Sequence, residues 1–193
     1  MKKDIILAGV GGQGILSIAA CIGMAALNEN LFLKQAEVHG MSQRGGAVQS
    51  HLRLSSDPIA SDLIPEGQAD LIIAVEPMES LRYTPMLQSS GWIITSINPY
   101  NNIPDYPDIE LILKEIWNQP HYITLDADNI AKDCGSLKAA NMVILGAAAP
   151  FLGLRPDSVE KAIKTIFAGK GDDVIQLNLK ALNHGRAYTL KHM

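Results

Sequence analysis

Short apolar runs alternate with longer apolar or amphipathic stretches along the first two-thirds of the chain. Apolar runs of about four to eight residues, bounded by glycine, proline or polar residues, are typical of buried strands. Such runs predict strands at residues 4–10, 31–38, 70–75, 91–97 and 121–125.

Residues 47–54 show a different pattern, because polar and apolar or small residues alternate. Leu52 and Leu54 fall on one side, whereas His51 and Arg53 fall on the other. A period of two predicts a strand with one face in the core and one face in solvent. Since a strand and not a helix follows the preceding loop, we expect this section to run antiparallel to the rest of the sheet.

Longer periodic stretches predict helices. Residues 13–28 are apolar nearly all round, which predicts a helix buried on most sides. Glu76-Pro77 starts a helix that we extend to about Leu87, because proline is favoured in the first turn. The other predicted helices are residues 108–117, 126–134, 137–152, 156–167 and 172–188, and residues 98–107 are predicted to form a loop.

The order of these elements defines the fold class. Strands dominate the first two-thirds and helices the last third, with no linker or repeat between them. We predict one α/β domain over residues 1–193, Rossmann-like or flavodoxin-like, with a mostly parallel sheet, an antiparallel strand and a helical C-terminal third. A content of 47% hydrophobic and 19% charged residues in 193 suits a globular chain with a substantial core.

Charge and cysteine content narrow the class of partner. A net charge of −4 gives no basic footprint for nucleic acid or an anionic membrane. Cys21 and Cys134 are too few to hold an iron–sulfur cluster or a structural zinc unaided, and they fit buried thiols in a reducing cytoplasm.

No leader is expected, since Met1-Lys2-Lys3-Asp4 leads directly into the first strand. The apolar runs at 15–27 and 142–154 are shorter than the roughly 20 residues that span a bilayer, so we expect a soluble, cytoplasmic protein.

The first candidate site is the string Gly9-Val10-Gly11-Gly12-Gln13-Gly14. A strand that ends in G-x-G-x-x-G and opens a helix is the arrangement that binds pyrophosphate. Gly9 would permit the tight turn, Gly11 would let the backbone approach a phosphate, and Gly14 would let the helix pack close to the sheet. The same glycines are also needed wherever a helix packs tightly on its strand, so Gly9, Gly11, Gly12, Gln13 and Gly14 form either an anion loop or a purely structural turn.

The second candidate site is the string Glu37-Val38-His39-Gly40-Met41-Ser42-Gln43-Arg44-Gly45-Gly46. Glu37 lies where a dinucleotide-binding domain carries its ribose-binding acid, but the expected crossover helix does not follow. A loop this polar and rich in glycine is predicted to order against a partner chain, a cofactor held by that chain, or an acyl or phosphate group met by Arg44. His39 can equally be a turn residue, since no second metal ligand accompanies it. Arg44 can equally be solvated or paired with Glu37.

Other chemistry receives little support. Ser17, Ser42 and Ser50 lack the G-x-S-x-G elbow of a hydrolase. Asp126 is predicted to be a helix N-cap, and Asp172-Asp173 suits the first turn of the last helix.

A resemblance to a known family rests on the two glycine-rich strings together with five further segments. These are Leu63-Ile64-Pro65, Ala69-Asp70, Glu76-Pro77, Asn141 to Gly146 and Asn178 to Ala181. In these segments the chain resembles the gamma domain of 2-oxoacid:ferredoxin oxidoreductases. The similarity covers nearly the whole chain and is closest to the beta subunit of the indolepyruvate-specific enzymes.

The resemblance implies a subunit and not a complete enzyme. Family members oxidatively decarboxylate 2-oxo acids with thiamine diphosphate, magnesium, coenzyme A and [4Fe–4S] clusters, and pass electrons to ferredoxin. This chain has no cysteine cluster, and Gly171-Asp172-Asp173 lacks the rest of the thiamine diphosphate motif. The resemblance therefore places these groups on a larger alpha subunit, and places residues Glu37 to Gly46 at the face toward it.

Two alternatives stay open at this point. One is an independent NAD(P)- or flavin-dependent oxidoreductase, and the other is a nucleotide- or acyl-group-binding protein. The apolar helices and seven methionines also leave a homodimer open for the isolated chain.

Overall fold

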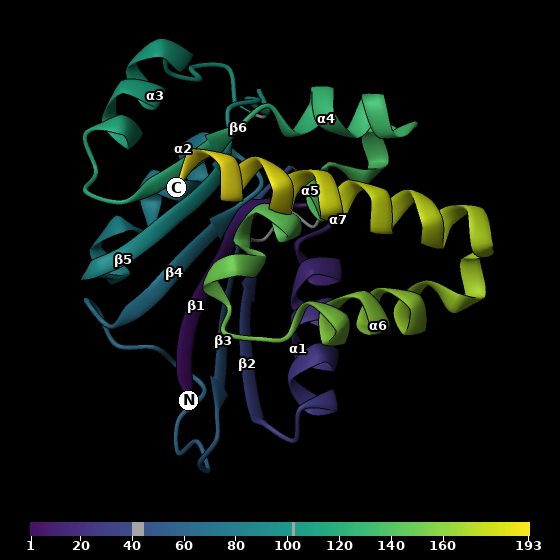
Figure 1. Cartoon of the computed structure of the whole chain (residues 1–193). Coiled ribbons are helices and arrows are strands. Elements are labelled where there is room, and N and C mark those ends of the chain that lie inside the picture. Colours follow the sequence, from purple (N-terminus) through teal and green to yellow (C-terminus); the bar gives the residue numbers. More distant parts are fainter. Residues whose placement is uncertain (40–44, 102) are drawn as a thin grey trace.

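A six-stranded sheet with the order β2-β3-β1-β4-β5-β6 forms the centre of the computed structural model, which describes residues 1–39, 45–101 and 103–193 (Figure 1). The six predicted strands are confirmed. Their bounds are β1 (Lys2–Val10), β2 (Phe32–His39), β3 (Ala47–Ser55), β4 (Ala69–Ala74), β5 (Leu87–Ser96) and β6 (Tyr122–Leu125).

The predicted antiparallel section is also confirmed. β3 lies between β2 and β1 and runs antiparallel to both, whereas β1, β4, β5 and β6 are mutually parallel. The chain moves from β1 toward one edge of the sheet through β2, and later toward the other edge through β5 and β6. The direction of winding therefore changes between β1 and β4.

Helices cover the sheet unequally. The α-helices are α1 (Ile15–Asn28), α2 (Pro77–Arg82), α3 (Ile109–Trp117), α4 (Ala127–Cys134), α5 (Ala140–Ala148), α6 (Pro156–Phe167) and α7 (Asp172–His192). Ile5 and Leu7 of β1 face the large core beneath α1, α5, α6 and α7, whereas Ile6 and Ala8 face a smaller core on the opposite side (Figure 1). Among the described residues no helix is both long and apolar enough to cross a membrane.

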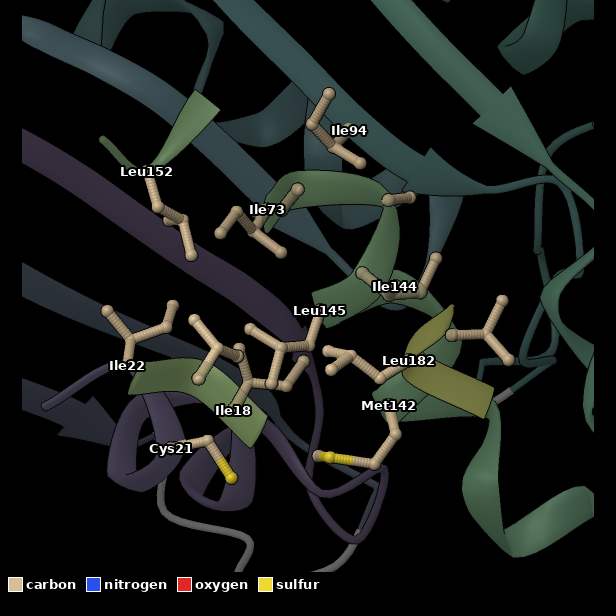
Figure 2. Close-up of a cluster of buried hydrophobic side chains, with 14 of the residues drawn as sticks. Ile18, Cys21, Ile22, Ile73, Ile94, Met142, Ile144, Leu145, Leu152 and Leu182 are labelled. Carbon is tan, nitrogen blue, oxygen red and sulfur yellow. The ribbon is translucent and has the colours of Figure 1, made fainter. Parts of the chain in front are cut away.

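Helix α5 lies in the middle of the large core. Figure 2 shows Leu145 of α5 beside Ile18 and Ile22 of α1, with Leu182 of α7 nearby and Ile73 of β4 above. These side chains are 0% to 3% exposed, so nearly all of their apolar surface is removed from water. The C-terminal helices predicted from sequence therefore complete the core of the sheet.

The helix predicted from Glu76 to Leu87 is too long. α2 ends at Arg82, a 3₁₀ turn covers Thr84–Met86, and β5 already begins at Leu87. Pro85 explains the early end, because proline has no N–H for a helical hydrogen bond and disfavours helical geometry in the residue before it.

The polar face of β3 is buried more deeply than the alternating pattern predicted. His51 is 7% exposed, and the Ile64 N–H donates to its Nδ1 at 3.0 Å. Arg53 pairs with Asp4, which is 1% exposed, and also donates to the Leu63 carbonyl. The prediction of a solvated face was wrong because the segment between β3 and β4 folds back over it.

We expect His51 to make stability depend on pH. Burial lowers its pKa below the usual 6.5, with Asp62 opposing and Arg53 assisting this shift. The unfolded chain therefore binds the proton more readily. The contribution of neutral His51 to the free energy of unfolding is fully present above about pH 6.5 and is lost as the pH falls through the lower folded pKa.

His51→Asn, which keeps an acceptor for the Ile64 N–H, should flatten this decline. Urea unfolding between pH 7.5 and 5 measures it, with the exposed His184→Asn as control. Equal slopes for His51→Asn and the parent chain would contradict the expectation.

Candidate functional site

The two glycine-rich strings meet in the structure. The Gly11 N–H donates to the Gly46 carbonyl at 2.8 Å, and the Gly45 N–H donates to the Gly11 carbonyl at 3.4 Å. The contact follows from the pairing of β1 with β3, which sets Val10 opposite Ala47. Residues that are 34 or more positions apart in the chain thus form one surface at the carboxyl end of β1.

The glycines of the first string have roles that differ from those predicted. Gly9 does not make the turn, because it lies within β1. A Cβ there would lie 2.5 Å from Val75 and 2.7 Å from Ile15, so its role is close packing. Positive φ angles occur instead at Gly12 (103°) and Gly14 (83°), a region that glycine tolerates best. The turn is therefore made three to five residues later than the sequence suggested.

Two amide side chains fix the glycine loop. Gln13 Oε1 accepts from the Val10 N–H at 2.8 Å, and Asn141 Nδ2 donates to the Gly14 carbonyl at 3.1 Å. A Cβ on Gly14 would lie 3.1 Å from Cγ of Asn141 and closer still to Nδ2, so Gly14 is also needed for this contact. Gly14 is the N-cap of α1, whose first turn has no acidic residue. The positive end of the helix dipole is thus left for an anion.

A cleft of about 800 Å³ opens beside this loop. It lies at the carboxyl ends of β1, β4 and β5, where the direction of winding changes, which is the usual ligand position in open α/β sheets. Its volume falls within the range of small-molecule sites. The lining includes Gly12, Gln13, Gly14, Ser17, Val75, Ser96, Asn98, Tyr100, Asp128, Leu137, Lys138, Asn141, Phe167, Lys170, Leu177 and Asn178.

Charges of both signs line the cleft. Lys138 and Lys170 are exposed at its wall, and Asp128 is half-buried. Burial raises the pKa of Asp128, Lys132 opposes that shift, and Asp126 adds to it. The cleft can therefore pair two ammonium groups and a helix N-terminus with phosphates, while Asp128 can accept from hydroxyl or amine groups.

Asn98 links the strands to the rim of the cleft. Its Oδ1 accepts from the Ser96 hydroxyl at 2.6 Å and from the Asp128 N–H at 3.1 Å, and its Nδ2 donates to Asp126 at 2.9 Å. Asp126 caps α4 as predicted. Asn98 and Asp128 were not predicted as site residues, although each closely follows a predicted strand, which was the available signal.

Glu76 holds the loop that carries Tyr100. The Glu76 carboxyl is 0% exposed and accepts from the N–H groups of Glu79 (2.8 Å) and Tyr100 (3.3 Å) and from the Tyr106 hydroxyl. Burial raises the pKa of Glu76 and of Tyr106, whereas the bonds that Glu76 accepts oppose its shift. This buried cluster fixes Tyr100, which is 46% exposed, at the cleft.

The second string is described only in part. Glu37 is half-buried on β2 opposite Ser50, and Gly45 and Gly46 adjoin the glycine loop. Gly40, Met41, Ser42, Gln43 and Arg44, and the side chain of His39, lie outside the described residues.

The two cysteines do not fit an iron–sulfur site. Cys21 lies in α1 and Cys134 ends α4, and both are buried. Burial raises the pKa of Cys21 to about 12 and also raises that of Cys134, and two cysteines are fewer than the four that hold a [4Fe–4S] cluster. Within residues 1–39, 45–101 and 103–193, no group of three His, Cys, Asp or Glu residues could hold a metal ion.

Comparisons with known proteins cover nearly the whole chain. A family model described as pyruvate ferredoxin/flavodoxin oxidoreductase matches residues 4–188. Indolepyruvate oxidoreductase subunit IorB of Archaeoglobus fulgidus is 37% identical over 196 residues, which is 96% of this chain and 94% of that protein.

Two solved structures share the fold. The gamma subunit of a keto/oxoacid ferredoxin oxidoreductase from Geobacter sulfurreducens has a TM-score of 0.72 and 23% identity, covering 98% of this chain and 99% of that one. A 2-oxoglutarate:ferredoxin oxidoreductase from Magnetococcus marinus, solved with 2-oxoglutarate, coenzyme A and succinyl-CoA, has a TM-score of 0.79 and 21% identity. It covers 98% of this chain but 31% of that chain.

Proposed function

The chain belongs to the pyruvate ferredoxin/flavodoxin oxidoreductase family, and we propose that it is the small subunit of a thiamine-diphosphate-dependent 2-oxoacid:ferredoxin oxidoreductase. The observation that carries the proposal is the similarity to an IorB subunit along almost the full length of both chains. On this basis the substrate is indolepyruvate or another arylpyruvate. The reaction releases carbon dioxide, transfers the acyl group to coenzyme A and passes two electrons to ferredoxin.

In this proposal the redox and thiamine chemistry belongs to a larger alpha subunit. Thiamine diphosphate, magnesium and [4Fe–4S] clusters would supply carbanion stabilisation and electron transfer there. Cys21 and Cys134 lie on separate helices, and two cysteines are too few for the four thiolates that hold a [4Fe–4S] cluster, which supports this division. A cytoplasmic location is part of the same proposal.

We place the contact with the larger subunit at residues 37–46. Gly45 and Gly46 are hydrogen-bonded to the glycine loop, so a chain bound there would lie next to the cleft. A subunit boundary beside a cleft would let both chains contribute to one ligand site. Arg44→Ala, or alanine at both Gly45 and Gly46, should weaken assembly with the larger subunit, and unchanged assembly and turnover would refute this contact.

The resemblance places coenzyme A on the larger subunit, whereas the cleft favours a shared site, in which this chain would take the phosphate-bearing part of coenzyme A. Phosphates would lie against the glycine loop, Lys138 and Lys170, and the apolar side chains of Leu137 and Phe167 would cover less polar parts. The Magnetococcus marinus structure, which holds coenzyme A, supports this choice of ligand. The residues of this chain would bind and orient the acyl acceptor and would take no part in bond making.

Lysine substitutions test the cleft. In the assembled enzyme, Lys138→Ala or Lys170→Ala should raise the KM for coenzyme A about threefold to tenfold, because a charge-assisted contact to phosphate is lost, while kcat stays close to its original value. The control is Lys164→Ala, an exposed lysine of α6 outside the cleft lining. A KM unchanged in both cleft variants would exclude phosphate binding at this wall.

Reconstitution tests the function as a whole. The chain is co-purified with the larger subunit encoded in the same genome, and ferredoxin reduction is measured with indolepyruvate, phenylpyruvate, pyruvate and 2-oxoisovalerate. We expect activity only when both chains are present, and highest with an arylpyruvate. If the isolated chain is strongly stabilised by NAD(P) or FAD and catalyses their reduction alone, the independent oxidoreductase is correct instead.

A further inference from the structure

The outer edge of β2 is long, regular and partly apolar. β2 forms one edge of the sheet and pairs with β3 without a bulge from Phe32 to His39. Its Phe32 and Val38 are 48% and 54% exposed. Because an edge strand of this kind presents backbone hydrogen-bonding groups to any chain that can pair with it, proteins usually shorten, bend or cover such edges.

Helix α1 adds a second apolar surface at the same edge, on the face of the sheet opposite to Phe32 and Val38. Helical spacing puts Leu16, Ala20, Gly23 and Leu27 on one side of the helix. Gly23 faces β2, because a Cβ there would lie 3.0 Å from the Leu33 side chain. The exposed members of the row, including Leu16 at 53% and Leu27 at 54%, therefore lie toward the open edge of the sheet, where α1 runs beside β2 (Figure 1).

We propose that a second copy of this chain pairs antiparallel with β2 about a two-fold axis at Gln35. This pairing joins two six-stranded sheets into one and brings the exposed rows of the two α1 helices toward each other. The inference is independent of the function proposed above, because it concerns the isolated chain.

The sequence of β2 is complementary to itself in this register. Directly opposed residues of an antiparallel pair point to the same face of the sheet. A two-fold axis between two copies of one strand must therefore pass between the two copies of a single residue. The other opposed residues are then an even number of positions apart in the sequence. With the axis at Gln35, Phe32 of each copy lies opposite Val38 of the other copy. The interface therefore contains two pairs of these exposed apolar side chains. Aromatic and β-branched residues are a favourable pair across strands.

Neighbouring registers are less suitable. An axis at Lys34 would oppose two ammonium groups, and an axis at Glu37 would oppose two carboxyl groups. An axis at Ala36 would set each Lys34 opposite Val38 of the second copy, so neither Phe32 nor Val38 would have an apolar partner. The axis at Gln35 sets Leu33 opposite Glu37, but Leu33 packs against the core and is not one of the exposed apolar residues. The two-fold axis at Gln35 is therefore the one that avoids like charges and covers both exposed apolar residues.

A charge exchange tests both the surface and the register. Sedimentation equilibrium of the isolated full chain should show a dimer. Phe32→Glu or Val38→Lys alone should raise its dissociation constant more than about tenfold, because a charge is set opposite an apolar side chain. The double variant should recover most of this loss, since each carboxylate then faces an ammonium of the second copy. Leu111→Glu, at an exposed position on α3, is the matched control, and circular dichroism melting shows whether each variant is folded.

Three outcomes would overturn the proposal: a parent chain that stays monomeric at all concentrations, single variants that dimerise like the parent, or a double variant no better than the single ones. Gln35→Cys adds a direct measurement. The two introduced thiols would meet at the axis and form a disulfide-linked dimer under mild oxidation. The native Cys21 and Cys134 are both buried, so a monomer after oxidation of Gln35→Cys also counts against this register.

Discussion

Gly185→Ala is expected to leave little folded protein. α5 and α7 cross so closely that a Cβ on Gly185 would lie 2.9 Å from Ala147 N and closer still to the Val143 carbonyl oxygen. The obstructing atoms belong to backbone and cannot rotate away, so the helices would have to separate. Overpacking usually costs about 1–3 kcal/mol, and we expect this variant at or above the upper end of that range.

The crossing has further support on both sides. A Cβ on Gly146 of α5 would collide with the Leu182 backbone, and the Thr189 hydroxyl donates to the Ala147 carbonyl at 2.9 Å within the core. Separation would thus break a buried hydrogen bond as well as apolar contacts. Urea unfolding monitored by circular dichroism measures the loss. Gly169→Ala is the control, because a Cβ there meets nothing within 4 Å. A Gly185→Ala variant as stable as the control would contradict this account.

Arg53→Met is expected to have an effect of similar size. Arg53 Nε and Nη2 donate to the two oxygens of Asp4 at 2.7 and 3.0 Å, and Nη1 donates to the carbonyls of Ser61 and Leu63. Asp4 is 1% exposed, so loss of the guanidinium leaves a buried carboxylate with too few partners. Breaking a buried pair by removing one partner typically costs about 3–5 kcal/mol.

A second cation on the same carboxylate supplies the control. Lys2 Nζ lies 3.0 Å from Asp4 Oδ2, but its side chain is 60% exposed, so Lys2→Met should cost less than about 1 kcal/mol. The double variant of Asp4→Asn and Arg53→Met should be more stable than Arg53→Met alone, because no unpaired charge remains. Equal losses of unfolding free energy for Arg53→Met and Lys2→Met would show that the burial of Asp4 does not determine the cost of removing a cationic partner.

Most secondary structure could be predicted because its signals are local. All six strands, the antiparallel β3 and helix α6 agree with the sequence pattern, and the glycine-rich strings are recognisable as candidates in the sequence alone. The errors arose where the packing of another segment could not be seen in the local pattern. The polar side of β3 looked solvated because the loop that covers it, which includes Leu63 and Ile64, has no periodic pattern to show that it folds back.

The candidate site could be predicted only in part for the same reason. Gly12, Gln13 and Gly14 were identified from their motif, and they line the cleft. Lys138 and Lys170 carry no such motif. They reach the cleft only because the C-terminal helices pack back across the carboxyl ends of the strands.

The sequence by itself determined the types of element, their order and the two glycine-rich strings, because these depend on periodicity and on the conformations that glycine and proline allow. The tertiary structure decided that Gly45 and Gly46 adjoin Gly11, and that Gly185 is needed where α7 crosses α5. Both depend on a strand register and a helix crossing, which are fixed by the sum of many contacts between distant segments and not by any local pattern.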